Sequence, residues 1–372
     1  MLSVNYVTRG YQVPLYPNAM QKVLLKKTFG CTRLVFNHFL AIQKESLMNQ
    51  GHIYTKIQIS HMLTLMKKDE DFSFLREVDS VALQSSYENL DCAFTKFFKE
   101  HKGFPHFKKK GYYSSYTAKN NNECIRTSHN CIRLPKIGWV KTKLHQSIEG
   151  HIQRVSVIDH GDGSYSLSIC ASCVPVETLP KTHQSIGIDV GISELMTLSN
   201  GKVYSNKRFY ASTLDKLIVQ QQKLSRMVRG SNNYERQRRK ISKLHRKIYN
   251  QRRNYYHKLS RKLIEEYDVI GAETLDIQSM MNGKVSNLNL LDASWSEMMR
   301  MLKYKAEWYG KKFIRISQYE PSSQRCHVCG YINKEVRDLG IREWECPECQ
   351  TKHNRDINAA INIKKTANRI VA

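Results

Sequence analysis

The sequence predicts a multidomain protein of mixed α/β and α+β class, with an α/β core in its second half. Three successive patterns predict this class. Apolar residues recur at helical spacing over residues 18–103, and short β-prone runs separated by Pro and Gly follow up to residue 183. From residue 184 onward, buried strands alternate with long helices. A chain of 372 residues is long enough for two to four such domains.

The first half is expected to hold a sheet that a helical unit interrupts. A short strand pattern precedes Asn18, which is a suitable cap for the helix that follows. Gly103-Phe104-Pro105 then ends the helical patterns. We therefore interpret residues 1–17 and 104–183 as one small antiparallel β-barrel or sandwich, with residues 18–103 inserted into it as a helical domain.

The second half has the order expected of an α/β core. Ile186 to Val190 is a buried strand, and the turn Ser199-Asn200-Gly201 predicts a hairpin after it. Residues 213–266 have the pattern of a helical hairpin that is interrupted near Gly230. A second buried strand ends at Glu273, and the chain closes with a further helix.

Three acidic residues stand out at the ends of these elements. Asp189 follows a buried apolar run, Glu273 ends another, and Asp356 begins the last helix. A carboxylate at an apolar core costs several kcal/mol unless something neutralises it. A basic partner is the usual explanation for one such acid, but three at the edges of one core favour divalent cations. Mg²⁺ binds few carboxylates together with water and phosphate oxygens, and two such ions can promote phosphodiester hydrolysis.

A second metal pattern is formed by two C-x₂-C pairs separated by sixteen residues: Cys326, Cys329, Cys346 and Cys349. Four cysteines close the coordination shell of a zinc ion, so the site is expected to be structural. His327 or His353 could replace a ligand, but the cysteine set is complete without them. We interpret residues 322–352 as a zinc ribbon inserted into an α/β domain made of residues 184–321 and 353–372.

The charge of the chain predicts a polyanionic partner. Lys and Arg number 59 against 33 Asp and Glu, a formal net charge of +26. Nucleic acid is the first candidate. A membrane partner is not expected, because no apolar run approaches the ~20 residues of a spanning helix. Residues 1–11 also lack the apolar core of a secretory signal. We therefore expect a cytoplasmic protein, associated with the nucleoid in a prokaryote.

Two basic stretches are the candidate nucleic-acid contacts. The first is the run Lys108, Lys109 and Lys110. The second is the polar face of the helical hairpin, with Arg236, Arg239, Lys243, Arg246, Lys247, Arg252 and Arg253. A merely solvated face would tolerate acids, and this stretch has almost none. Trp344 of the ribbon and the nearby Arg325, Arg337 and Arg342 are further candidates.

Several segments resemble the TnpB family of transposon-encoded, RNA-guided endonucleases, which are related to type V CRISPR effectors. The similar segments are residues 11–37, 97–110, 187–191, 250–260, 270–275, 320–324 and 354–363. The sequence departs from the family pattern at Asn254 and Asn354, where the family often has Asp. Neither position is an inferred metal ligand.

The resemblance implies a RuvC/RNase H-like nuclease domain that carries the zinc ribbon, together with a wedge β-barrel interrupted by a helical recognition domain. It places the catalytic acids at Asp189, Glu273 and Asp356, with two Mg²⁺ ions that Mn²⁺ can replace. The implied function is that of an RNA-guided DNA endonuclease of a transposable element. Its expected partners are a guide RNA from the element's own end and double-stranded target DNA beside a transposon-adjacent motif. We expect a monomer on the RNA, with a dimer as the alternative.

Two other functions could use the same scaffold. A non-catalytic RNA-guided DNA-binding repressor would be expected to lack at least one of the three acids, and here all three are present. A transposase would join DNA strands through an RNase H-like site, and strand transfer without RNA would identify it.

Overall fold

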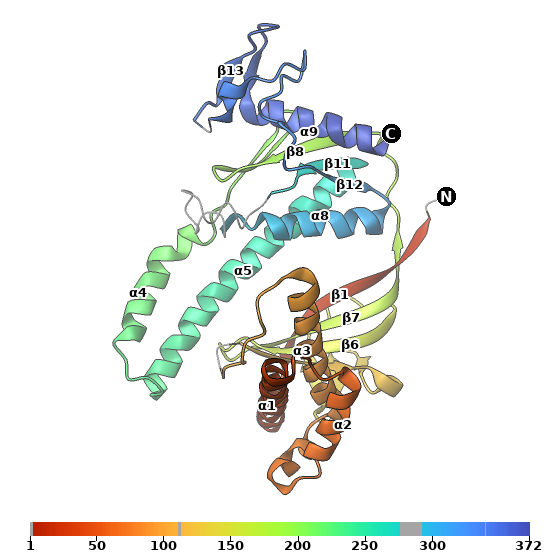
Figure 1. Cartoon of the computed structure of the whole chain (residues 1–372), viewed down its shortest axis with the longest axis vertical. Coiled ribbons are helices and arrows are strands. Elements are labelled where there is room, and N and C mark those ends of the chain that lie inside the picture. The colour runs from red at the N-terminus through yellow and green to blue at the C-terminus, as the bar shows by residue number, and fades with distance from the viewer. Residues whose placement is uncertain (1–2, 111–112, 276–291, 339) are drawn as a thin grey trace. The chain divides into compact units, whose positions relative to one another are not determined.

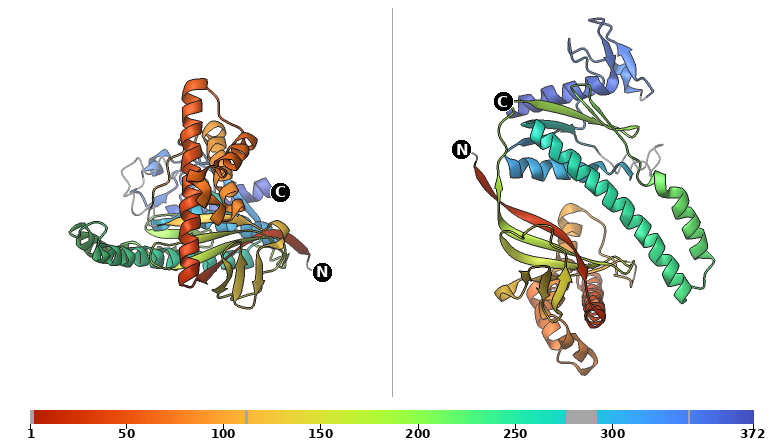
Figure 2. Two further views of the ribbon diagram at one scale, coloured as in Figure 1. Left: turned by 90° about the horizontal axis from the view of Figure 1, so that it is seen from below. Right: turned by 180° about the vertical axis from the view of Figure 1, so that it is seen from behind.

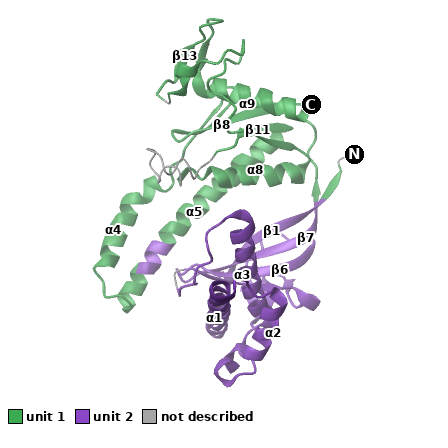
Figure 3. Ribbon diagram, in the orientation of Figure 1, with its two compact units in different colours: residues 1–5, 176–237, 243–372 green, residues 6–175, 238–242 purple. Residues whose placement is uncertain are grey.

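The computed structural model describes residues 3–110, 113–275, 292–338 and 340–372. Figures 1 and 2 show the chain from three sides, and Figure 3 colours its two compact units. Unit 1 consists of Met1–Asn5, Val176–Gln237 and Lys243–Ala372. Unit 2 consists of Tyr6–Pro175 and Arg238–Ser242. We describe each unit by itself.

Unit 2 is built on a seven-stranded sheet of order β2-β6-β7-β1-β5-β4-β3. Its strands are β1 (Val4–Tyr16), β2 (Ser114–Lys119), β3 (Arg126–Ser128), β4 (Cys131–Leu134), β5 (Gly138–Thr142), β6 (His151–Asp159) and β7 (Tyr165–Glu177), with the short 3₁₀ helix η2 (Asn121–Glu123). Every strand pair whose register is described is antiparallel. Among the described pairs, β2 and β3 end the sheet, so the expected closure into a barrel stays a prediction.

The helices of unit 2 are α1 (Ala19–Gln50), α2 (Lys56–Met66) and α3 (Ser80–Glu100), with the 3₁₀ helix η1 (Glu70–Glu77). Asn18 begins α1 with a capping box, in which Asn18 and Gln21 each accept a hydrogen bond from the backbone N–H of the other. Gly51 ends the helix in the left-handed conformation, at φ 70°. The helices share an apolar core that includes Phe39 and Phe94. The predicted cap of α1 is confirmed. The assignment of residues 18–103 to a separate helical domain stays a prediction.

Unit 1 contains a five-stranded sheet of order β10-β9-β8-β11-β12. The strands are β8 (Ser185–Val190), β9 (Glu194–Leu198), β10 (Val203–Ser205), β11 (Val269–Glu273) and β12 (Lys312–Ile316). The neighbouring strands β8, β11 and β12 are parallel to one another, and β12 is at one edge of the sheet. On the other side, β9 pairs with β8 and β10 pairs with β9, both in antiparallel orientation. This arrangement confirms the predicted buried strands and the hairpin.

Helices cover both faces of this sheet, with α5 and α8 on one face and α9 on the other (Figures 1 and 2). Within the described part of unit 1, the helices outside residues 322–352 are α4 (Leu214–Ser225), α5 (Asn232–Glu266), α8 (Trp295–Tyr309) and α9 (Arg355–Val371), with the 3₁₀ helix η3 (Ala211–Thr213). Ile186 and Ile188 of β8 lie in one apolar cluster with residues of α5 and α8. Side chains alternate along a strand, so Gly187 and Asp189 face α9.

Two glycines let α9 lie close to the sheet. A Cβ atom at Gly187 would lie 1.9 Å from the carbonyl oxygen of Ala360, and one at Gly271 would lie 2.7 Å from Cβ of Ala367. Such distances are impossible for real atoms, so only glycine permits this approach. The small buried residues of α9 therefore pack directly against the backbone of β8 and β11.

The zinc-ribbon segment has a small sheet of its own, formed by β13 (Glu343–Glu345) and β14 (Lys352–Asn354), with the 3₁₀ helix η4 (Lys334–Arg337). Cys326, Val336, Trp344 and Cys346 form its buried core. None of the described helices combines the length and the apolar composition that a membrane span requires.

Candidate metal centres

Asp189 and Glu273 lie beside each other near the carboxyl ends of the neighbouring strands β8 and β11. β8 and β11 are parallel, and Ile188 lies opposite Ala272. The next residue along each strand is one of the two acids. Residues opposite each other in a sheet point to the same face, which here is the face that α9 covers. Two half-buried carboxylates therefore stand side by side at the carboxyl edge of the sheet.

The direction of α9 brings Asp356 to the same edge. Asn368, near the end of the helix, donates a hydrogen bond of 3.0 Å to Ser185 at the start of β8. Ala360 contacts Gly187 farther along that strand, so α9 runs antiparallel to β8. Asp356 lies about one turn before Ala360, in the first turn of the helix. Each predicted acid thus comes from a different element, and all three lie at one end of the sheet.

Burial and mutual repulsion oppose the ionisation of these acids. The pKa of Asp189 is raised well above its ordinary value, first by burial and then by the negative charges of Glu273 and Asp356, while the Arg355 guanidinium acts in the opposite sense. Burial also raises the pKa of Glu273, against the effects of Ser322 and Arg355. A bound cation would reverse both shifts, because it favours the charged form of each carboxylate.

Polar neighbours hold two of the acids. The Ser322 hydroxyl donates a hydrogen bond to Oε1 of Glu273. Arg342 of the ribbon donates from Nη1 to Oδ1 of Asp356 over 3.2 Å. Arg355 is almost fully buried and donates to the backbone oxygens of Asp338 and Ile341. Its guanidinium is thus fixed beside the acids by backbone carbonyls.

The donor sets of the two candidate centres differ in spacing. Of the described residues, only the four cysteines form a group of three or more whose metal-type ligand atoms all lie within 4.8 Å of one another, and the three acids do not form such a group. A wider set of carboxylates suits two ions about 3.5–4 Å apart with water completing their shells. The chemistry of the three acids therefore fits Mg²⁺ or Mn²⁺.

The four predicted cysteines converge on one point. The Sγ atoms of Cys326 and Cys349 are 3.6 Å apart, as are those of Cys329 and Cys346. Tetrahedral Zn–S bonds of about 2.3 Å separate the sulfur atoms by about 3.8 Å, so the cluster fits a zinc ion. The two C-x₂-C turns are equivalent, since Gly330 N donates to Cys326 O and Gln350 N donates to Cys346 O, over 3.0 and 2.8 Å.

Trp344 and His353 belong to the buried part of the ribbon, and His327 packs against His353. His353 Nε2 lies 3.1 Å from Cys326 Sγ, and His327 Nδ1 lies 3.0 Å from the amide oxygen of Asn358. Trp344 is only 8% exposed and belongs to the ribbon core. Trp344 keeps little exposed ring surface for stacking on a base, and its contact with nucleic acid stays a prediction. It is the middle residue of β13, so its two glutamate neighbours face solvent while its ring faces inward.

The predicted basic contacts differ in exposure. Lys108, Lys109 and Lys110 are all exposed. Lys108 places its Nζ 3.9 Å from the centre of the Phe36 ring, burial lowers its pKa, and Asn37 binds its backbone N–H and oxygen. On α5, Arg236, Arg239, Lys243 and Lys247 are exposed, whereas Arg246, Arg252 and Arg253 are half-buried. A nucleic-acid role for these residues stays a prediction.

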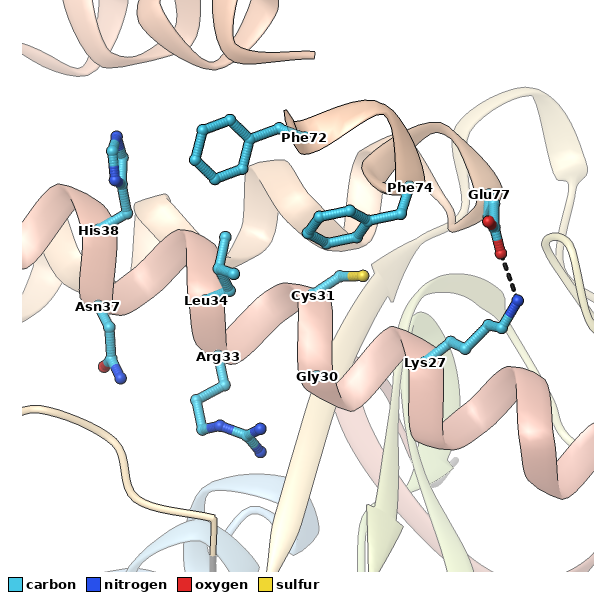
Figure 4. Close-up of a pocket in the computed structure, with 10 residues that line it drawn as sticks. All are labelled: Lys27, Gly30, Cys31, Arg33, Leu34, Asn37, His38, Phe72, Phe74 and Glu77. Atoms are coloured by element: carbon cyan, nitrogen blue, oxygen red, sulfur yellow. Dashed lines mark hydrogen bonds and ion pairs between the residues drawn. The ribbon is translucent and has the colours of Figure 1, made fainter. Parts of the chain in front are cut away.

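A cavity in unit 2 offers different chemistry (Figure 4). It measures about 840 Å³ and lies between α1 and η1, with Phe72 and Phe74 beside Leu34. Its described lining contains a single acid, Glu77, and that acid is paired with Lys27. The cavity therefore lacks the clustered carboxylates of a divalent-cation site.

Ser322 and Arg355 are the site residues that the sequence analysis did not identify. Both lie in segments that the sequence comparison had marked, but no local pattern reveals that they approach the acids. Ser322 and Glu273 are 49 residues apart in the sequence. The position of Arg355 depends on its hydrogen bonds to the backbone of the ribbon, at Asp338 and Ile341. Only the tertiary structure provides this information.

Comparisons with known proteins extend over the whole chain. A family model described as "Probable transposase" matches residues 168–283, and one described as "Cas12f1-like, TNB domain" matches residues 295–363. A third, described as "Helix-turn-helix domain", matches residues 1–52, which contain β1 and α1 in this structure. The first range includes Asp189 and Glu273, and the second includes Asp356 and the four cysteines.

Two relatives match almost all of the sequence. A protein of Streptomyces pristinaespiralis named as an RNA-guided DNA endonuclease is 33% identical over 364 residues, which cover 96% of this chain and 89% of that protein. The protein of Escherichia coli K12 named as the RNA-guided DNA endonuclease InsQ is 30% identical, with coverage of 98% and 93%. A solved Cas12f1-sgRNA-target DNA complex has the same fold, with a TM-score of 0.57, 13% identity, and coverage of 96% of this chain and 99% of that one.

Proposed function

The chain belongs to the TnpB family, and from this membership we propose that it is an RNA-guided DNA endonuclease of a transposable element, with Asp189, Glu273 and Asp356 as its catalytic acids. The observation that carries the proposal is the position of Asp189 beside two other acids, where the ionised form of its carboxyl is disfavoured. Burial and two neighbouring acids oppose its charge, and a divalent cation at that edge of the sheet would relieve this opposition. The names of the two full-length relatives give the reaction its substrate class.

Each acid has a defined part in this proposal. When bound, two Mg²⁺ or Mn²⁺ ions would supply an activated water and stabilise the leaving oxygen of a phosphodiester. Asp189 and Glu273, from neighbouring strands, would be ligands on one side, and Asp356 would be a ligand from α9. Arg355 provides a fixed positive charge beside them, and Arg342 is paired with Asp356. The protein thus orients the acids through its sheet and its last helix.

The four cysteines are proposed to hold a structural zinc ion. A four-thiolate shell is closed and leaves no position for a substrate. The ribbon of residues 322–352 would then be a target-nucleic-acid-binding element whose shape depends on zinc. Residues 184–321 and 353–372 would form the RuvC-like domain around the acids.

The remaining residues are proposed to bind the nucleic acids. Residues 1–17 and 104–183 would act as the wedge domain and residues 18–103 as the recognition domain, holding a guide RNA and reading a short motif in duplex DNA. A net charge of +26 suits a large RNA better than a short DNA contact. A monomer on the RNA is the proposed assembly.

The proposal is tested by purifying the protein with its associated RNA, sequencing that RNA, and assaying cleavage of plasmid DNA that matches the guide. We expect one discrete RNA and Mg²⁺-dependent double-strand cleavage that follows a reprogrammed guide. Asp189→Ala should abolish cleavage, a loss of at least about 10³-fold if metal stabilisation of several kcal/mol is removed, and should spare RNA and DNA binding. The exposed Asp215→Asn is the matched control.

Three results would contradict the proposal. Cleavage by Asp189→Ala at the wild-type rate would exclude this acid from the site. Guided binding without cleavage by the wild-type protein would favour a repressor. Strand transfer in the absence of any discrete RNA would favour a transposase.

A further inference from the structure

Ser322 lies at the start of the zinc ribbon, in the segment between β12 and Cys326, and it contacts Glu273. The residue is 5% exposed, and its hydroxyl donates a hydrogen bond to Oε1 of the Glu273 carboxylate. An ionised carboxylate only accepts hydrogen bonds, so the serine is the donor. The bond fixes the orientation of one carboxylate oxygen and leaves the other oxygen for a ligand.

Two asparagines of α9 hold this segment in place. Asn362 donates from Nδ2 to the backbone oxygens of Ser322 and Arg325, over 2.8 and 2.6 Å. Asn358 donates to the backbone oxygens of Ser323 and Arg325, over 3.3 and 2.8 Å. The two asparagines are 4% and 1% exposed and lie one helical turn apart on one face of α9. Their amides therefore fix the position of Ser322 along the axis of α9.

These contacts connect two of the three acids. α9 carries Asp356 in its first turn, and the same helix holds Ser322 through Asn362. Ser322 in turn binds Glu273 on β11. The segment then continues into Cys326, the first cysteine of the ribbon. The position of Glu273 thus depends on a chain of hydrogen bonds that begins on the helix of Asp356.

We propose that Ser322 is a positioning residue for Glu273, and that Asn362 anchors it. This inference rests on the proposed function of Glu273 as a metal ligand. Hydrogen-bond partners of ligating carboxylates orient them, and loss of such a partner typically lowers metal affinity about 10–100-fold. The alternative is a purely structural role, in which the bond only satisfies a buried hydroxyl. Metal affinity separates the two roles, because a structural role would change stability alone.

The test compares Ser322→Ala and Ser322→Thr with Ser323→Ala in the full-length chain. Ser323 is the matched control, because its hydroxyl has no hydrogen-bond partner within the described part of the chain. Mn²⁺ binding is measured by electron paramagnetic resonance of the free ion, with Asp189→Ala as the reference for binding elsewhere. The Mg²⁺ concentration for half-maximal cleavage and the melting temperature are measured on the same variants.

We expect Ser322→Ala to weaken Mn²⁺ binding about 10–100-fold and to need correspondingly more Mg²⁺, while Ser322→Thr and Ser323→Ala stay near the wild type. Wild-type Mn²⁺ affinity in Ser322→Ala, with or without a lower melting temperature, would overturn the inference. So would an equal loss in Ser323→Ala. If Ser322→Ala does not fold, Ser322→Cys gives the same test, because it keeps the volume and donates only weakly.

The proposed function fails separately from this inference. If Asp189→Ala binds Mn²⁺ and cleaves DNA like the wild type, the acids are not the metal site. If Asp189→Ala loses both properties while Ser322→Ala keeps both, only the positioning role of Ser322 is wrong.

Discussion

Asp189 is placed where its own charge is unfavourable before a cation arrives. Burial raises its pKa first, and the charges of Glu273 and Asp356 add to the shift. A protonated carboxyl is a poor ligand for Mg²⁺, so metal binding at this site should release protons and weaken as the pH falls. The geometry that concentrates negative charge for the metal therefore reduces the stability of the metal-free protein.

This trade-off predicts that Asp189→Asn stabilises the magnesium-free protein at neutral pH. The folded-state pKa of Asp189 lies above the unfolded value of 3.8, so its stabilising contribution is complete below that value and is lost as the pH rises through the folded pKa. Asparagine cannot ionise. The melting temperature of the variant should exceed that of the wild type at about pH 7.5, by roughly 2–4 °C for each kcal/mol of repulsion removed.

Calorimetry of Asp189→Asn and the wild type at two pH values checks the direction of the change in melting temperature. At about pH 4 the gain should shrink, because there the wild-type carboxyl is largely protonated as well. The exposed Asp215→Asn should show no such pH-dependent gain. A variant that melts at the wild-type temperature at both pH values would contradict the raised pKa.

At the scale of elements, local signals in the sequence predicted most of the helices. Asn18 caps α1 as expected, and the interruption near Gly230 separates α4 from α5. The strands β2 and β3 were not predicted. β2, with sequence SSYTAK, has few apolar residues, and its pairing with β6 depends on contacts about 40 residues away. The local periodicity of a sequence does not reveal pairing between strands that are far apart in the chain.

The same limit applies to the candidate site. The sequence predicted the three acids and the four cysteines, because each stands at the end of an element or in a fixed spacing. It could not predict that Gly187 and Gly271 admit α9 onto the sheet, because a glycine in a strand has several explanations. The approach of α9 is nevertheless what brings Asp356 to the other two acids.

Gly187→Ala should therefore displace α9. The added Cβ would lie 1.9 Å from a backbone oxygen of Ala360, and backbone atoms of a packed helix cannot move aside cheaply. We expect a loss of about 1–3 kcal/mol or more in urea unfolding, together with reduced cleavage. Gly10→Ala on β1 is the matched control, since a Cβ there has no neighbour within 4 Å. Equal stability of the two variants would show that α9 is not held this closely.

An ion pair between the buried Lys311 and the half-buried Asp268 joins the starts of β11 and β12 to the segment before β8. Lys311 Nζ lies 2.5 Å from Oδ1 of Asp268 and 2.6 Å from the oxygen of Pro180, while the N–H groups of Thr182 and His183 donate to the same carboxylate. Although burial opposes it, these hydrogen bonds lower the pKa of Asp268 to about 2. The stability from Asp268 is thus present above pH 3.8 and is lost as the pH falls through about 2.

Lys311→Met should destabilise unit 1, because it leaves the half-buried carboxylate of Asp268 without its cation. Removal of one partner of a buried pair typically costs about 3–5 kcal/mol. Lys312→Met, at the exposed neighbouring position, should change the unfolding free energy by less than about 0.5 kcal/mol. Chemical denaturation of both variants tests the difference, and similar values for the two would show that the ion pair contributes little.

At the scale of the whole molecule, charge and fold point to the same partner. The net charge of +26 is large for 372 residues, and the exposed side of α5 carries much of it. The fold is shared with the solved Cas12f1-sgRNA-target DNA complex at 13% sequence identity, so it is compatible with widely different sequences. Charge on an exposed helix face is not required for folding, and binding of a polyanion explains the excess of basic residues on α5.

The last prediction concerns the salt dependence of RNA binding. Arg236, Lys243 and Lys247 are exposed on α5, so their triple replacement by Gln should alter stability little. Each phosphate contact contributes about 0.7–0.9 to the slope of log affinity against log salt concentration. We therefore expect the triple variant to bind its guide RNA more weakly and with a slope smaller by about 2–3.

Lys262→Gln is the control for a general charge effect, because Lys262 pairs with Glu266 at 3.8 Å on the same helix and its charge is partly neutralised. Its salt slope should stay near that of the wild type. If the triple variant keeps the wild-type slope, the exposed face of α5 does not contact RNA phosphates, and the high charge must act elsewhere on the molecule. If the slope falls equally in the triple variant and in Lys262→Gln, the charges act through long-range attraction rather than direct contact. Only direct contact depends on which basic residues are replaced.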